Sequence, residues 1–477
     1  MYDRMHSLSE SELGLIHKNS MDILEKTGVA FMYEEALEIF KSHGFRVEGN
    51  TVYFTEEDVR KSLSTTPSQF VVEGRNPEKS VSIGEDDWVF LPTYGAPYIC
   101  EKDGSQRPGT LADYESICKL VQTSPYIDMN AFKLVEPSDV PTETAYLDML
   151  QANMLMCDKP FMGSTDTIEA CRDTMEMLSI LFGGRETLKE KVVCLGLVNV
   201  LSPLKYGEEM AGAIVEYARN GQAMAIINMI MGGTSGPVSL PGLVTLMNAE
   251  ILAGVVLSQL VNPGTPVVYG TTSCPTNMQS GAATIGAPET YIINAWTTQI
   301  ARYYNLPCRT GGSITDSLIP DAQSMAEGAL CLSTTVRNGA NFILHSCGMI
   351  GTYIGCNMEK WIIDEEMCGM VRSMMRTVPV TEESIGVEAI QRVGIGGNYL
   401  MDPDTLKHCR TAFYKTSFYN KSDASAWMKS GGLSLADAAS VELEKRFAAY
   451  ERPAIDPEVE KALIAYIEGR KASFKAA

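Results

Sequence analysis

The sequence predicts an α/β protein whose main domain is a (β/α)₈ barrel, and three observations support this fold class. Between residues 88 and 395, eight strand-like apolar runs alternate with eight helix-like segments. From Gly264 to Lys360, each apolar run breaks into a polar, glycine-rich loop, and successive runs are about 35 to 40 residues apart. No G-x-G-x-x-G motif follows a strand, which argues against the rival fold, an open doubly wound sheet.

Residues 1–87 are predicted to form an α+β extension ahead of the barrel. Its first helix, Ser9–Thr27, begins with the capping pattern of Ser9 and Glu12. Two further helices and three short strands are expected at Tyr33–His43 and Thr55–Ser64, and at Thr51–Phe54, Gln69–Gly74 and Ser80–Ile83. We expect this extension to pack on one end of the main domain.

Residues 88–395 are predicted to form the catalytic barrel. The expected strands are Trp88–Pro92, Ile127–Val135, Pro160–Ser164, Val193–Val200, Ala223–Met229, Val267–Gly270, Cys308–Gly311 and Phe342–His345. The expected helices are Thr110–Thr123, Glu143–Cys157, Ile168–Phe182, Gly207–Asn220, Leu243–Val261, Ala287–Tyr304, Ala322–Asn338 and Lys360–Arg376. The first strand is the weakest assignment, and a late strand near Val393 is its alternative.

Residues 396–477 are predicted to form a loop followed by a helical tail. The tail has two helices, Ser434–Glu451 and Asp456–Ala472, separated at Pro453. Such a tail either caps the barrel or holds a second subunit, so a homodimer is a possible assembly.

Composition narrows the classes of partner and compartment. The 477 residues carry a net charge of −20, which argues against a nucleic acid or an anionic membrane as partner. The twelve cysteines include no C-x-x-C pair and suit a reducing compartment. The N-terminus shows no apolar signal core, and the most apolar segment, Leu240–Leu260, contains Asn248, Glu250 and Gln259. A cytoplasmic protein is therefore expected.

Two candidate catalytic residues follow predicted strands. His345 ends a strand-like run and is the only histidine in the predicted barrel, so it is placed to bind a ligand. Its alternative role is that of a core histidine satisfied by its neighbours. Asp316 lies in the loop after the preceding strand, where it contacts substrate, organises the loop, or serves only a local turn. Asp321, five residues on, is better explained as a helix cap.

Aromatic and polar side chains recur in the predicted loops around the barrel mouth. Tyr94, Tyr98, Tyr269 and Tyr353 would hold a quaternary ammonium by cation–π attraction, although any one of them could serve packing alone. Asn199 ends a strand and is a candidate polar group of the same pocket. We expect no metal ligands, because no histidine or cysteine set has a common spacing.

A glycine-rich loop contains Gly232, Gly233 and Ser235. Such a loop can cradle a phosphate, but no lysine or arginine follows it. It can equally let a flat macrocycle approach the rim of the barrel. We therefore assign these three residues to cofactor binding.

The segments PVVYG, GAPE, ARYYNLP, GGSITDS, PDAQ and NMEK, with GGNYL near the C-terminus, resemble the trimethylamine methyltransferase family. The resemblance implies a (β/α)₈ barrel that passes a methyl group from an amine to the Co(I) corrinoid of a separate carrier protein. The archaeal trimethylamine enzymes contain pyrrolysine, and this sequence has none. It therefore resembles the branch associated with quaternary amines such as glycine betaine, proline betaine and carnitine.

The resemblance also implies that no corrinoid is tightly held by this chain, because the D-x-H-x-x-G motif of corrinoid carriers is absent. Cobalamin would then be supplied by the carrier. A quaternary nitrogen leaves as a neutral amine without a general acid, which fits the scarcity of candidate acids and bases. The alternatives are a barrel lyase or hydrolase of a small polar substrate, a non-catalytic betaine-binding protein, and a zinc-dependent methyltransferase using His345, Cys347 and Cys356.

Overall fold

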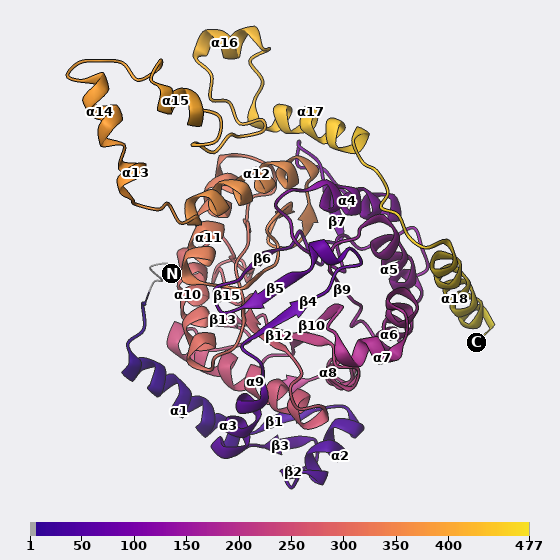
Figure 1. Ribbon diagram of the computed structural model, residues 1–477. Helices are drawn as coiled ribbons and strands as arrows, with labels where there is room; N and C mark the ends of the chain where they lie inside the picture. The colour runs from indigo at the N-terminus through magenta and orange to yellow at the C-terminus, as the bar shows by residue number, and fades with distance from the viewer. Residues whose placement is uncertain (1–5, 477) are drawn as a thin grey trace.

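The computed structural model describes residues 6–476 and shows an α/β protein with a TIM-barrel-like parallel sheet (Figure 1). Seven parallel strands follow the order β6-β17-β16-β14-β12-β10-β9. They are β6 (Val89–Phe90), β9 (Phe161–Met162), β10 (Cys194–Val200), β12 (Ala223–Asn228), β14 (Val267–Thr271), β16 (Cys308–Arg309) and β17 (Phe342–Ile343). Seven of the eight expected strands are therefore present.

The expected strand Ile127–Val135 is instead an irregular segment that bonds to both edge strands of the sheet. The Asp128 backbone N–H donates to the Phe90 carbonyl, and the Asn130 N–H donates to the Pro160 carbonyl. Side chains here accept hydrogen bonds that backbone carbonyls would accept in a regular sheet. The Asp128 carboxylate accepts from the Phe90 N–H, and Asn130 Oδ1 accepts from the Ala131 N–H. The strand prediction failed for that reason.

Eight helices of the predicted alternation surround the sheet. They are α4 (Leu111–Thr123), α5 (Ala145–Met156), α6 (Ile168–Phe182), α8 (Glu208–Arg219), α9 (Leu240–Val261), α10 (Pro288–Tyr303), α11 (Ala322–Asn338) and α12 (Met358–Met375). A short α7 (Arg185–Glu190) follows α6. Asp321 caps α11 by accepting from the Ser324 N–H, as the sequence predicts. In the described chain, α9 alone is long and apolar enough to span a membrane, but it is mostly buried against other helices.

The N-terminal extension packs on the outer helices of the barrel. It contains α1 (Glu10–Lys26), α2 (Glu34–Ser42) and α3 (Glu56–Thr65), which contact α9. Its sheet combines β1 (Val29–Phe31), β2 (Arg46–Glu48) and β3 (Thr51–Tyr53) with β11 (Lys205–Tyr206). The predicted capping box of Ser9 and Glu12 starts α1.

A second part of the extension covers the N-terminal end of the barrel. The hairpin of β4 (Gln69–Val72) and β5 (Val81–Gly84), with a 3₁₀ turn at Pro77–Lys79, lies across the strands (Figure 1). The Glu73 N–H donates to the carbonyl of Val192, which lies just before β10. Asn341, just before β17, donates from Nδ2 to the carbonyl of Glu85, which follows β5. A small ligand must therefore enter from the carboxyl end of the strands.

Short strands build the rim at that carboxyl end. One small sheet contains β7 (Tyr98–Cys100), β8 (Gln106–Pro108), β18 (Met349–Ile350) and β19 (Gly355–Cys356). A second pairs β13 (Met231–Gly232) with β15 (Cys274–Pro275). These strands hold the loops after β6, β12, β14 and β17 in place.

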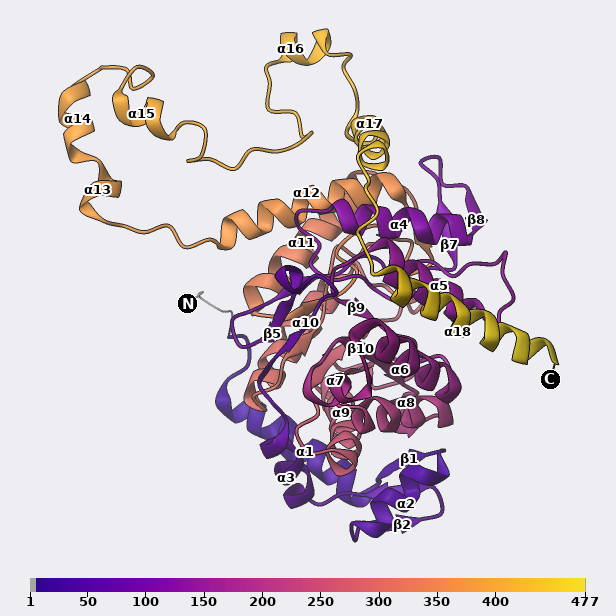
Figure 2. The same ribbon diagram turned by 45° about the vertical axis from the view of Figure 1, so that its right-hand side comes forward.

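The C-terminal part begins after α12 with α13 (Glu382–Ile385), α14 (Val387–Val393), α15 (Pro403–His408) and α16 (Ala424–Lys429). Val393 lies in α14, so the alternative of a late barrel strand at this position is wrong. The tail then returns as α17 (Leu435–Ala448), which packs on α12 and α4, and as α18 (Pro457–Ala476) along α5 and α6 (Figure 2). The two predicted tail helices are therefore present.

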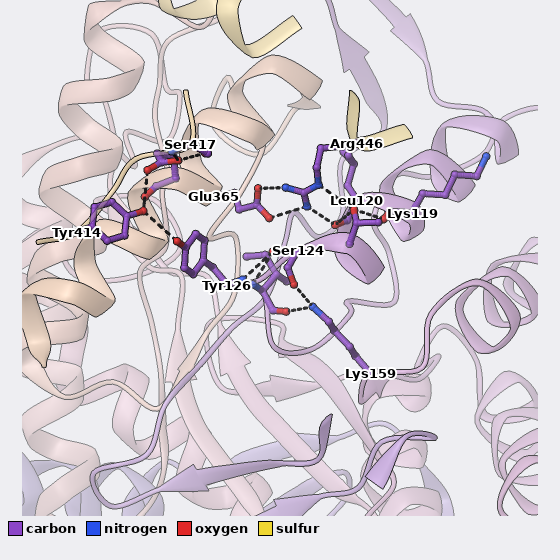
Figure 3. A network of polar contacts seen from close by, with 12 residues as sticks. Lys119, Leu120, Ser124, Tyr126, Lys159, Glu365, Tyr414, Ser417 and Arg446 are labelled. Atoms are coloured by element: carbon purple, nitrogen blue, oxygen red, sulfur yellow. Dashed lines mark hydrogen bonds and ion pairs between the residues drawn. The ribbon is translucent and has the colours of Figure 1, made fainter. Parts of the chain in front are cut away.

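Polar contacts anchor the returning tail to α12 and α4 (Figure 3). Arg446 of α17 makes two hydrogen bonds to Glu365, of 2.7 and 3.0 Å, and also donates to the Leu120 carbonyl of α4. Tyr414 donates to Glu366 at 2.8 Å, and Ser417 bonds to the same carboxylate through its backbone and its hydroxyl. The tail is thus fixed at two points.

A buried ion pair joins α12 to the barrel rim. Lys360 Nζ lies 2.7 Å from Asp364 Oδ2, and both side chains are fully buried. Lys360 also donates to the Ser313 carbonyl, while Asp364 accepts from the Ser313 hydroxyl and the Gly348 N–H. The pair therefore connects the loops that follow β16 and β17.

Replacing Lys360 by Met is expected to destabilise the protein by about 3–5 kcal/mol, because the buried Asp364 carboxylate loses its cation. Urea unfolding measures this loss. The control is Lys189→Met in the exposed pair with Glu186, which should change stability by no more than about 0.5 kcal/mol. Equal effects of the two substitutions would contradict the assigned role.

Candidate functional site

His345 lies at the carboxyl end of β17 with both ring nitrogens engaged. Its Nδ1 is 2.9 Å from Nη2 of Arg309, and its Nε2 is 3.1 Å from the Tyr94 carbonyl oxygen. A guanidinium only donates and a carbonyl only accepts, so Nδ1 accepts and Nε2 carries the proton. Burial, together with the nearby Arg309 cation, holds the pKa of His345 well below its usual value. His345 is therefore a neutral, immobilised imidazole.

Arg309 is the centre of positive charge in this site. Its side chain is fully buried, and besides His345 it donates to the Thr271 carbonyl at 2.7 Å. Its Nε has no hydrogen-bond partner. Within residues 6–476, no carboxylate forms an ion pair with it. Burial lowers its pKa from the ordinary value.

A buried cation with a free N–H and no counter-ion is costly, since desolvation is compensated only by an anion or by a full set of acceptors. The Arg309 environment is therefore suited to a ligand carboxylate. The sequence alone does not fix the direction of the Arg309 side chain. The available signal was its position, directly after the buried Cys308 at the end of a barrel strand.

Two tyrosines lie beside this charged centre. The Tyr353 ring centroid is 4.8 Å from that of His345, with the rings tilted by 49°. Tyr94 contributes the carbonyl that binds His345, and its own side chain is half-buried. Burial raises the pKa of Tyr94 to about 12 and also raises that of Tyr353, so both phenols stay neutral at physiological pH. Neutral aromatic faces attract a cation without adding a formal charge.

The backbone around His345 is strained. His345, Thr352 and Tyr353 adopt φ angles of +62°, +57° and +68°, a left-handed region that few non-glycine residues occupy. Gly312 makes the close approach possible, because a Cβ there would lie 2.4 Å from the Leu344 carbonyl oxygen. The Ser313 N–H then donates to the His345 carbonyl at 2.9 Å. Such strain concentrates at functional sites, where the surrounding structure maintains it.

Asp316 organises loops rather than joining His345. Its two oxygens accept from the N–H groups of Ile285 and Gly286, each at 3.0 Å, and from the Thr352 hydroxyl at 2.8 Å. The carboxylate therefore ties the loops after β14, β16 and β17 together. Of the roles left open by the sequence, this geometry fits the loop-organising one, and it places Tyr353 through Thr352.

The other predicted substrate-binding residues do not all meet at this centre. Tyr269 points away from the mouth into the helix layer, where its hydroxyl donates to Asn248 of α9. Successive side chains of a strand point to opposite faces of the sheet, so the position of Tyr269 in β14 decides its direction. Tyr98 belongs to the small rim sheet and is 39% exposed. Asn199 is exposed at the end of β10, so solvent reaches the end of this central strand.

The glycine-rich loop forms a tight turn at the rim. The Gly233 N–H donates to the Gly236 carbonyl, and the Ser235 hydroxyl accepts from the Met231 N–H. Gly232 pairs with Pro275 across β13 and β15. Gly233 packs close to the sulfur of Met278. The loop thus uses much of its own hydrogen-bonding capacity internally.

A cleft of about 1410 Å³ lies beside the mouth, between the rim loops and α18, and Tyr98 is among its lining residues. Its charges are largely paired, since Lys133 lies 2.6 Å from Asp166 and Arg470 lies 2.8 Å from Asp173. An anionic ligand gains less from paired cations than from the unpaired Arg309. In the described part of the chain, no group of three or more His, Cys, Asp or Glu side chains is arranged to hold a metal ion.

Comparisons with known proteins agree with this architecture. Residues 1–475 match the family model described as trimethylamine methyltransferase (MTTB). The glycine betaine methyltransferase of Desulfitobacterium hafniense (strain Y51) is 41% identical over 463 residues, covering 97% of this chain and 96% of that protein. The proline betaine:corrinoid methyltransferase of Eubacterium limosum is 32% identical over 467 residues, covering 95% and 94%.

A solved structure supports the fold. The monomethylamine methyltransferase (MtmB) of Methanosarcina barkeri superposes with a TM-score of 0.54 at 12% identity, covering 93% of this chain and 88% of that one. The sequence matches extend over almost the whole length of the chain, including the segments that hold Arg309, His345 and Tyr353. This chain therefore belongs to the trimethylamine methyltransferase (MTTB) family.

Proposed function

We propose that this protein transfers a methyl group from a betaine, a quaternary ammonium that also carries a carboxylate, to the corrinoid of a separate carrier protein. The tertiary amine is the other product. One observation carries the proposal: a buried, unpaired Arg309 lies beside neutral tyrosine rings at the carboxyl end of the sheet. The relatives named for glycine betaine and proline betaine support the same substrate class.

The two ends of a betaine match the two halves of this site. The carboxylate would bind the Arg309 guanidinium, whose Nε–H has no partner. The trimethylammonium end would lie against the faces of Tyr94 and Tyr353. A zwitterion compensates the buried cation and still adds no net charge to the barrel interior. Trimethylamine has no anionic group for Arg309.

The neutral state of His345 also favours a quaternary substrate. When the carbon–nitrogen bond breaks, its electron pair returns to a nitrogen that was positively charged, so the leaving amine is neutral and needs no proton. His345 is poorly placed to supply one, because its only N–H is bound to the Tyr94 carbonyl. A tertiary amine would need such a proton to leave.

The reduced corrinoid supplies a strong nucleophile that accepts the methyl group. This chain contributes orientation: Arg309 fixes one end of the substrate and the tyrosines hold the methyl groups toward the open end of the barrel. The positive charge on nitrogen disappears in the transition state. Aromatic faces suit this change better than a carboxylate partner, which would stabilise the ground state more strongly than the transition state.

The remaining parts of the proposal concern assembly. We infer that the segment at 128–130 closes the parallel sheet into a (β/α)₈ barrel, since it bonds to both edge strands. The carrier then docks over the carboxyl end, where the Gly232–Ser235 loop lies on the rim.

The chain is proposed to act in the cytoplasm, without a tightly held corrinoid. A lyase or hydrolase is less favoured, because His345 and Asp316 do not form an acid–base pair.

The purified protein is expected to methylate cob(I)alamin from glycine betaine, and the loss of cob(I)alamin absorbance measures the reaction. Trimethylamine and dimethylamine at the same concentration serve as controls and should react at least tenfold more slowly. Faster reaction with trimethylamine than with any betaine would contradict the proposed substrate class.

Arg309→Gln is expected to raise KM for glycine betaine by at least tenfold, because a charge-assisted hydrogen bond contributes about 1.5–3 kcal/mol. Tetramethylammonium, which has the same cationic group but no carboxylate, is the internal control. Its turnover should change by less than about threefold in the same variant. A parallel loss with both substrates would show that Arg309 maintains the fold of the site without binding the carboxylate.

The free energy of unfolding should fall as the pH drops below about 6.5, in part because of His345. Its pKa is lowered in the folded state, so below that pH the unfolded chain binds a proton that the folded chain excludes. Urea unfolding at pH 7.5, 6.5 and 5.5 measures the slope for the parent protein and for His345→Gln. The variant should lose up to about 1.4 kcal/mol per pH unit of this dependence. Identical slopes would mean that folding does not lower the pKa of His345.

A further inference from the structure

The segment between α12 and α17, residues 377–433, projects from the barrel as an arm (Figure 2). It contains α13, α14, α15 and α16. At its return it is held to α12 by the contacts of Tyr414 and Ser417 with Glu366. The intervening turns lie away from the barrel in both views (Figures 1 and 2).

The arm exposes far more apolar surface than a free surface loop needs. Thirteen of its large hydrophobic side chains are exposed, and the most exposed include Val380, Ile395, Leu400, Met401, Phe413 and Met428, at 66% or more. At roughly 60 Å² each, these thirteen side chains present on the order of 800 Å². One partner of a standard protein–protein interface contributes about that area.

The arm is locally ordered, although little of it touches the barrel. Arg392 makes two hydrogen bonds with Asp402, of 2.8 and 3.0 Å, which join α14 to the start of α15. Thr381 and Ser384 form a capping box at α13, and Asp423 caps α16. A pre-shaped segment loses little conformational freedom when it docks, so its apolar surface is available for binding.

The charge of the arm does not oppose a partner as acidic as this protein. The arm has six Lys or Arg and six Asp or Glu residues, so the whole net charge of −20 lies outside it. Two copies of such an acidic body repel each other over most of their surfaces. A neutral, apolar arm lets them associate without bringing like charges together.

The place where the arm starts favours a second copy over the corrinoid carrier as the partner of α13, α14 and α15. α12 begins beside the rim strand β19, and its 18 residues carry the chain about 27 Å away from the mouth before the arm starts. The arm therefore starts at the end of α12 away from the mouth that the carrier must reach, and the chain returns to the mouth end at α17, where Asp437 pairs with Lys102 and Ser440 binds Glu359. The arm leaves the barrel beside α11 and α12 (Figure 1). The neighbouring helices α10, α11 and α12 expose Tyr303, Leu330 and Met374, at 46%, 57% and 63%.

We propose that this arm docks on a second copy of the chain, with its apolar side chains covering the flank formed by Tyr303, Leu330 and Met374. Because both surfaces belong to the same chain, a two-fold axis lets each copy give its arm and receive the other. The arms then bury two such surfaces at once, which yields a closed dimer.

Light scattering after size exclusion tests this proposal with the full chain. The parent protein should have the mass of two chains at micromolar concentration. The double variant Leu400→Asp/Phe413→Asp should dissociate at least 100-fold more readily, while its circular dichroism stays unchanged because both side chains are exposed. The matched control Leu15→Asp/Val71→Asp alters two exposed apolar residues of the N-terminal extension and should remain dimeric.

The receiving flank is tested separately by Leu330→Asp, which should weaken the dimer without any change in the arm. A parent protein that stays monomeric up to 100 times the assay concentration overturns the proposal. So does a dimer that is equally stable in the arm variant and in the control. Methyl transfer to free cob(I)alamin is measured in the same preparations, and its presence or absence leaves the dimer result intact.

Discussion

The contact between Arg309 and His345 is the interaction on which the rest of this site depends. The guanidinium occupies the histidine nitrogen that would otherwise take a proton, and the histidine in turn holds the Tyr94 backbone through its other nitrogen. Three segments distant in sequence are thereby joined in one chain of hydrogen bonds. The same contact leaves one guanidinium N–H unused in a buried setting. A cation that is held firmly but not neutralised is prepared for an anionic ligand.

The surroundings of this contact are built for rigidity. The Lys360–Asp364 pair fastens the loops after β16 and β17, while Asp316 ties the loop of Tyr353 to two others. The hairpin β4–β5 covers the opposite end of the barrel. The acidic residues near the site therefore hold loops in place, and the groups that we propose to face the ligand are a cation, a neutral imidazole and phenol rings. That set suits the binding and alignment of a zwitterion better than proton transfer.

Much of the fold could be predicted from the sequence, because most elements have local causes. Capping residues such as Ser9 and Asp321 mark helix starts, and apolar runs mark the strands of the sheet. The strand predicted from Ile127 to Val135 is absent, because the side chains of Asp128 and Asn130 bind backbone N–H groups and interrupt the backbone hydrogen bonds between strands. In the site, His345 was found from its place at a strand end. The contact of Arg309 with His345 could not be predicted, because the direction of a side chain in a two-residue strand depends on the residues that pack around it.

The sequence by itself determined the β/α alternation, the helix ends, and the family, since these depend on local patterns and on motifs contiguous in the chain. Only the tertiary structure decided which strand-end residues share the mouth. Tyr269 and Arg309 both belong to barrel strands, yet one points to the helix layer and the other to His345. The tertiary structure also decided that the apolar side chains of the arm, residues 377–433, remain exposed. Burial and pairing arise from segments hundreds of residues apart, and no local pattern encodes which of them meet.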